Sequence, residues 1–98
     1  MGRRRFEHLV VELSVAIGGP IPRYALWLRL GELGWNPEAL SHRAVMSFYD
    51  EHLQDFLHDC GATLTARKAR RLRRSLKRFD PRHLSPYEQM ERFGSARN

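Results

Sequence analysis

The sequence predicts an all-α protein, a compact bundle of four helices followed by a short C-terminal helix. Apolar residues recur every three or four positions in several long segments, and most glycines and prolines fall between these segments. No stretch alternates apolar and polar side chains as a half-buried strand does. The 98 residues suit one domain, and we expect it to span residues 1–98 with flexible ends at 1–5 and 95–98.

The first two predicted helices cover residues 3–17 and 22–33, separated by a turn rich in glycine and proline. In the first helix, one face collects the apolar residues Phe6, Leu9, Val10, Leu13, Ala16 and Ile17. The second helix is apolar around most of its circumference, so we expect it to lie centrally in the bundle. Gly31 inside it indicates either close packing or a weak point.

Asn36 and Pro37 suit the N-cap and first position of a third helix, which we expect to run from Pro37 to Cys60. The tight connection through Gly34 is typical of a helix-turn-helix, and also of many other helical domains. The third helix is the expected spine of the core because of its broad apolar arc, formed by Val45, Phe48, Tyr49, Leu53, Phe56, Leu57 and Cys60.

The fourth helix is predicted to start at Thr63 or Thr65 and to end at Arg78. A connection this short favours antiparallel packing against the third helix. We expect Phe48, Leu53, Phe56 and Leu57 of the third helix to contact Leu72, Leu76 and Phe79. An acidic line on the third helix, formed by Glu51, Asp55 and Asp59, is expected to face Lys68 or Arg73. A capping box at residues 85–88 predicts the short last helix, which ends near Phe93.

The fourth helix is amphipathic, and its polar face carries charge of only one sign. Ala69, Leu72, Leu76 and Phe79 form its apolar stripe. The opposite third of its surface holds the candidate nucleic-acid-binding residues Arg67, Arg70, Arg71, Arg74, Lys77 and Arg78. With a formal net charge of +6, the chain favours an acidic partner.

Three interpretations of this basic face remain open: contacts to nucleic-acid phosphates, docking on an acidic protein, and a solvated face that serves solubility. Solubility alone would not require like charges at i, i+3 and i+4, which repel each other. We therefore predict a small, non-catalytic nucleic-acid-binding or nucleic-acid-associated protein that acts through phosphate contacts. Base stacking from this helix is not expected, because no aromatic residues alternate with the arginines.

Catalysis, metal binding and cofactor binding have little support in the sequence. His52 and His58 are six residues apart and point to different sides of a helix, and the neighbours His58, Asp59 and Cys60 cannot converge on one ion. No motif for nucleophilic catalysis or nucleotide binding occurs. We expect no enzyme activity, no metal and no cofactor.

Cys60 is the only cysteine, so no intrachain disulfide can form, as is usual for a cytoplasmic protein. The apolar part of the first helix is interrupted by charged residues, so it does not read as a secretory signal. No apolar run approaches the roughly 20 residues that a membrane-spanning helix needs. We therefore expect a cytoplasmic protein with no membrane partner.

The alternative function is a protein-interaction module, such as an assembly factor or a regulator. It would dock an acidic partner through the basic face or use an aromatic surface formed by Tyr24, Trp27 and Trp35. These aromatic residues belong either to the core or to such a surface. Exposure of several of them would favour a homodimer, because large apolar patches are rare on monomers.

Overall fold

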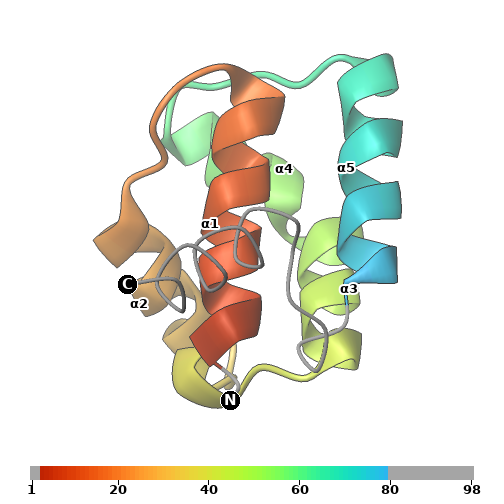
Figure 1. Ribbon diagram of the computed structural model, residues 1–98. Coiled ribbons are helices and arrows are strands. Elements are labelled where there is room, and N and C mark those ends of the chain that lie inside the picture. Colours follow the sequence, from red (N-terminus) through yellow and green to blue (C-terminus); the bar gives the residue numbers. More distant parts are fainter. Residues whose placement is uncertain (1–2, 80–98) are drawn as a thin grey trace, which may run out of the picture.

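The computed structural model describes residues 3–79, which form an all-α fold. The α-helices are α1 (Arg3–Ile17), α2 (Arg23–Glu32), α3 (His42–Glu51), α4 (Leu53–Asp59) and α5 (Ala66–Arg78), and a 3₁₀ turn, η1 (Pro37–Ala39), precedes α3. No strand occurs within this range. Figure 1 shows α1 in the middle of the bundle, with α5 on one side and α2 on the other. The predicted C-terminal helix lies outside the described residues.

The predicted helix at residues 3–17 is confirmed, and it supplies much of the core. Phe6, Leu9, Leu13 and Ala16 are buried, while Val10 and Ile17 are partly buried against the same cluster. Residues 3–5, which we expected to be flexible, form the first turn of α1. Val11 and Val15 lie on the opposite side and are exposed.

The central position that we predicted for the second helix is wrong. Only Leu26 and Leu30 of α2 are buried, whereas Tyr24 and Leu28 are exposed on its outer side. The tight packing that we considered for Gly31 is also wrong, because a Cβ atom there would meet no other atom within 4 Å. Hence α2 covers one edge of the core with a single face.

Surface ion pairs tie this peripheral helix to its neighbours. The guanidinium of Arg23 bonds to Glu7 of α1, and that of Arg29 bonds to Asp59 of α4. Such exposed pairs usually contribute about 1 kcal/mol or less. The buried Leu26 and Leu30 therefore account for most of the attachment of α2.

The continuous third helix that we predicted from Pro37 to Cys60 is also wrong. The Asn36 side chain accepts a hydrogen bond from the Glu38 amide at 3.0 Å, but it caps only η1. The chain is then extended at Leu40, and Ser41 starts α3 by accepting from the Ala44 amide at 3.0 Å. A second interruption at His52 separates α3 from α4.

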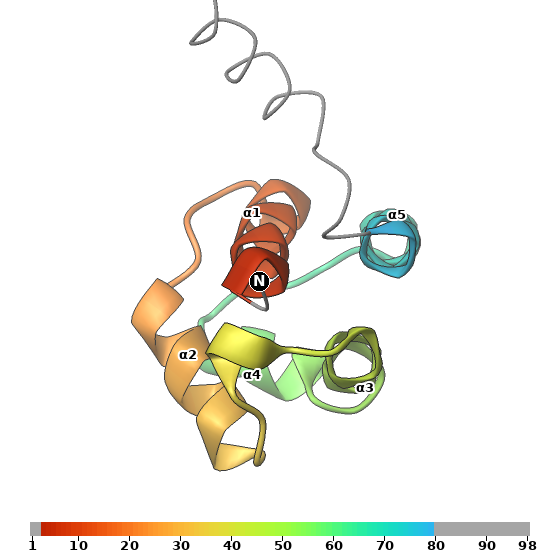
Figure 2. The ribbon, with the colours of Figure 1, turned by 60° about the horizontal axis from the view of Figure 1, so that its bottom comes forward.

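The bend at His52 turns the chain sharply. In Figure 2, α3 is seen nearly end-on while α4 runs sideways beneath α1. Phe48 before the bend and Phe56 after it both reach the core, where their rings meet edge to face at 6.0 Å. The His52 ring packs on Trp35 at a centroid distance of 6.0 Å. These contacts favour the bend over a straight helix.

Three helices end in the glycine turn that the sequence predicts: α1 at Gly18, which has a φ of 75°, and α2 and α4 in the two turns described next. After α2, Gly34 has a φ of 91°, and the Trp35 amide donates to the Leu30 carbonyl at 3.0 Å. After α4, Gly61 has a φ of 70°, and the Ala62 amide donates to the Leu57 carbonyl at 2.9 Å. A side chain is strained at positive φ, so glycine suits all three positions.

Candidate nucleic-acid interface

The fourth predicted helix is confirmed as α5, and its local sequence explains its limits. The Thr65 hydroxyl accepts a hydrogen bond from the Lys68 amide at 3.2 Å and so caps the first turn. Leu72 and Leu76 are each only 2 % exposed and face the core. No other side chain of α5 is fully buried, so two leucines hold the helix on the bundle.

The packing of α5 is broader than we predicted. Running opposite to α3, it packs on it as expected, but it also lies along α1 (Figures 1 and 2). The phenolic hydroxyl of Tyr49 donates to the Ala69 carbonyl at 2.6 Å, which links α3 to α5. At the far end, the Phe79 ring meets the ring of His8 on α1 at 4.0 Å. Together these contacts fix which face of α5 is turned outward.

All six candidate residues are exposed on this outward face: Arg67, Arg70, Arg71, Arg74, Lys77 and Arg78. None of the six pairs with a carboxylate of residues 3–79. The structure thus brings the predicted residues together on one surface and leaves their charges uncompensated by the described part of the chain.

The contact expected for the acidic line is made by a different acid. Arg73 Nε lies 3.4 Å from Asp50 Oδ1 on α3, and both side chains are about half exposed. Of the predicted acids, Glu51 lies beside His52 and Asp59 bonds to Arg29. The predicted line assumed an unbroken helix, and the bend at His52 interrupts that helix directly after Glu51.

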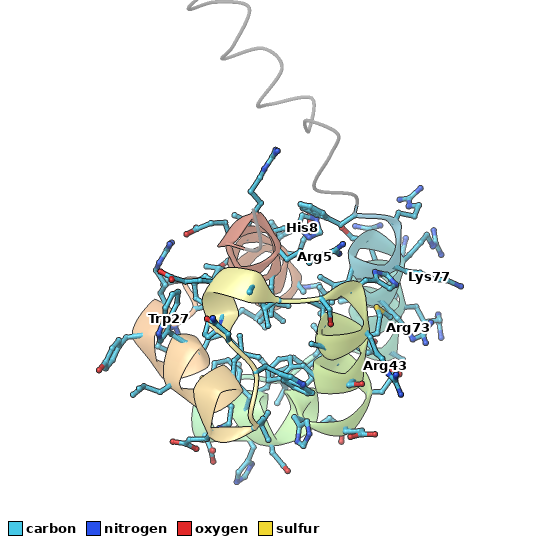
Figure 3. All side chains as sticks on the ribbon, turned by 90° about the horizontal axis from the view of Figure 1, so that it is seen from below. Arg5, His8, Trp27, Arg43, Arg73 and Lys77 are labelled. Atoms are coloured by element: carbon cyan, nitrogen blue, oxygen red, sulfur yellow. The ribbon has the colours of Figure 1, made fainter. Side chains whose placement is uncertain are left out.

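Sequence reasoning missed two arginines that border the basic face. Arg43 lies seven residues before Asp50, so the two share the face of α3 that Asp50 turns towards α5. Arg5 lies one turn before His8, on the side of α1 that meets Phe79. Figure 3 shows Arg43 beside Arg73 at the edge of the molecule, and Arg5 between α1 and α5. Arg43 had a usable signal, as the sole basic residue of the acidic segment 37–60.

The positive charge of the protein is concentrated in α5. This helix holds eight of the 17 basic residues and no acid, so the remaining residues hold nine basic and eleven acidic side chains. The net charge of +6 therefore arises from α5, because the residues outside this helix carry a small excess of acids. Such a distribution produces a strong local field at a molecule of modest total charge.

Away from α5, the described surface holds a cavity with an acidic lining. Within residues 3–79, no three His, Cys, Asp or Glu side chains gather as metal ligands would. A cavity of about 360 Å³ lies between α3, α4 and the start of α5, and both leucines and the acids Asp50, Glu51 and Asp55 line it. This acidic lining repels phosphate, so the cavity is not part of the basic face.

Cys60, which the sequence places at the end of the apolar arc, is partly buried. Burial raises the pKa of the Cys60 thiol, the negative charge of Asp59 raises it further, and Arg29 partly opposes the shift. A raised pKa keeps the thiol protonated and poorly nucleophilic near neutral pH. No helix in the described part of the chain is long and apolar enough to cross a membrane.

Comparison with known proteins does not assign a function. No protein family, characterised protein or solved structure matches this chain significantly. The basic face of α5 must therefore be interpreted from its own geometry and charge.

Proposed function

We propose that this chain is a small, non-catalytic, cytoplasmic protein that binds nucleic acid through phosphate contacts from α5. One observation carries the proposal: six exposed cations occupy one helix face without a carboxylate partner in the described chain. Their mutual repulsion costs a few tenths of a kcal/mol for each neighbouring pair. A polyanion would remove that cost and release its own counterions, which drives binding.

The first test uses the purified protein. Co-purifying nucleic acid should raise the ratio of absorbance at 260 nm to that at 280 nm, and high salt should strip it. Replacing Arg70, Arg74 and Lys77 with glutamine should weaken binding to all sequences about equally and reduce the salt slope by about one per lost phosphate contact. Each substitution should change the free energy of unfolding by less than about 0.5 kcal/mol.

A control variant removes two positive charges elsewhere. Arg23→Gln with Arg29→Gln lowers the net charge on α2, which lies on the far side of the bundle from α5 (Figure 2). This variant should retain nucleic-acid affinity. Wild-type protein that binds neither duplex nor single strand at low salt would rule out the proposal.

The outer side of α2 favours a second function, a protein-interaction module. Tyr24 is 73 % exposed and Leu28 is 45 % exposed, one turn apart on the same face. Trp27 beside them is only partly buried. Self-association through this face should appear in light scattering as a concentration-dependent mass, and Tyr24→Ser with Leu28→Ser should abolish it. A monomer at all concentrations would exclude the homodimer.

A further inference from the structure

Seven of the eight exposed cations of α5 fall into two parallel rows, and the eighth, Lys68, lies nearer to Leu72. Arg70, Arg73 and Lys77 form the first row, and Arg67, Arg71, Arg74 and Arg78 form the second. Neighbours within each row are three or four residues apart, so each row is a continuous ridge along the helix. The two ridges lie about a quarter of a turn apart on a helix of 3.6 residues per turn.

The contacts of α5 show which way each row faces. The first row lies on the flank towards α3, because Arg73 of this row bonds to Asp50, and Arg43 of α3 borders it. The second row lies a quarter of a turn further from α3, on the side of the helix opposite Leu72 and Leu76. The helix therefore presents positive charge from its flank towards α3 round to its outer side.

The position of α5 leaves both rows accessible. In Figure 2 it lies at one corner of the bundle, with α1 and α3 touching only its inner side. Its apolar contacts with the core are made by Leu72 and Leu76, opposite the rows. The outer half of the helix thus projects from the bundle along its whole length, which is about 20 Å for 13 residues.

Two rows of cations on a projecting helix match a groove with a phosphate strand on each wall. The major groove of B-form DNA is about 12 Å wide and admits an α-helix, whose diameter with side chains is about 10–12 Å. A single strand offers only one line of phosphates and would leave one row unused. The major groove of A-form RNA is too narrow and deep for side chains to read.

We propose that α5 binds in the major groove of B-form duplex DNA, with one row of cations directed at the phosphates of each strand. This inference rests on the proposed function and specifies its partner. Arg43, which lies beside Arg73 of the first row, extends the contacts of that row beyond the groove.

The first measurement compares three probes of equal length: a DNA duplex of mixed sequence, the matching RNA duplex, and one of the DNA strands. Fluorescence anisotropy at low salt should show the DNA duplex bound about tenfold more tightly than either alternative. Dimethyl sulfate should then methylate guanine N7 in the major groove less efficiently in the complex, while adenine N3 in the minor groove should react as in free DNA.

The second measurement tests the two rows separately. Arg70→Gln with Lys77→Gln neutralises part of the first row, and Arg71→Gln with Arg78→Gln neutralises part of the second. Both variants should lose duplex affinity by similar factors, and each should reduce the salt slope by about two. Arg23→Gln with Arg29→Gln removes the same charge from α2 and should leave the affinity unchanged. Circular dichroism checks that each variant is folded.

The outcomes separate this inference from the proposed function. Equal affinity for the three probes, an unprotected guanine N7, or a row whose neutralisation has no effect would overturn the major-groove inference while leaving nucleic-acid binding intact. Absence of binding to every probe would overturn both.

Discussion

Phe56 is a buried core residue next to the bend at His52. It is 1 % exposed, packs edge to face on Phe48, and has the Arg29 guanidinium 5.6 Å from its ring centre. Phe56→Ala should lower the free energy of unfolding by about 3–5 kcal/mol, because it removes buried apolar surface and leaves a cavity. Urea denaturation measures this loss.

Val15→Ala is the matched control for Phe56→Ala, because Val15 is exposed on α1. It should change stability by less than about 0.5 kcal/mol. A loss below about 1 kcal/mol for Phe56→Ala would contradict the core that the structure describes.

Tyr49 links α3 to α5 through a hydrogen bond that depends on its proton. Burial raises the pKa of its phenol, Arg73 partly opposes the shift, and Asp50 adds to it. Above about pH 10, the unfolded chain loses this proton while the native chain keeps it. The unfolded state then binds fewer protons, so the free energy of unfolding falls as the pH rises through this range.

Tyr49→Phe should therefore have two effects. Near neutral pH it should cost about 1 kcal/mol, because the Ala69 carbonyl loses its donor. Above about pH 10 it should lose stability less steeply than the wild type. Tyr24→Phe on the exposed side of α2 is the control and should follow the wild type. Parallel stability curves for Tyr49→Phe and wild type would contradict a role for this phenol.

At the scale of elements, alanine should have opposite effects on stability at Gly31, inside α2, and at Gly34, just after it. Gly31 lies within the helix, and a Cβ atom there meets nothing within 4 Å. Gly31→Ala should stabilise the protein by about 0.5–1 kcal/mol, because alanine has the higher helix propensity. Gly34→Ala should destabilise it, because the φ of 91° strains any side chain. Thermal unfolding measures both changes, and shifts of the same sign would contradict this account of α2.

Local signals in the sequence predict most elements, and tertiary contacts explain the failures. The apolar spacing of α1, the Thr65 cap of α5 and the glycine turns at Gly34 and Gly61 act locally, so they are readable from the chain itself. No glycine or proline near His52 indicates the bend in the sequence. It depends on packing against Trp35 and on bringing Phe48 and Phe56 together, which are contacts between residues distant in sequence or separated by the bend.

The candidate site likewise has a part that the sequence predicts and a part that depends on tertiary packing. Helical spacing alone places the six cations of α5 on one face, because the apolar stripe determines which side is buried. The neighbours Arg43 and Arg5 cannot be assigned from spacing, because their positions depend on how α3 and α1 pack on α5. The partner of Arg73 was missed because it depends on the register between α3 and α5.

For the whole molecule, the uneven charge predicts an unusual salt response. The cations of α5 repel each other, and only Arg73 has a carboxylate partner within residues 3–79. Raising the ionic strength from about 20 to about 200 mM should screen this repulsion and increase the free energy of unfolding in urea. The variant with glutamine at positions 70, 74 and 77 should respond less. A wild-type stability that falls with added salt would show that attractive ion pairs dominate instead.

The anchoring of α5 by Leu72 and Leu76 also has a consequence for local opening. Only two side chains of α5 are buried, and the helix carries many like charges, whereas α1 has four buried side chains. We therefore expect α5 to detach from the bundle more readily than α1. Its backbone amides should therefore exchange with deuterium sooner than those of α1. A bound polyanion would slow that exchange selectively in α5, so a map of deuterium uptake would locate the ligand on the fold.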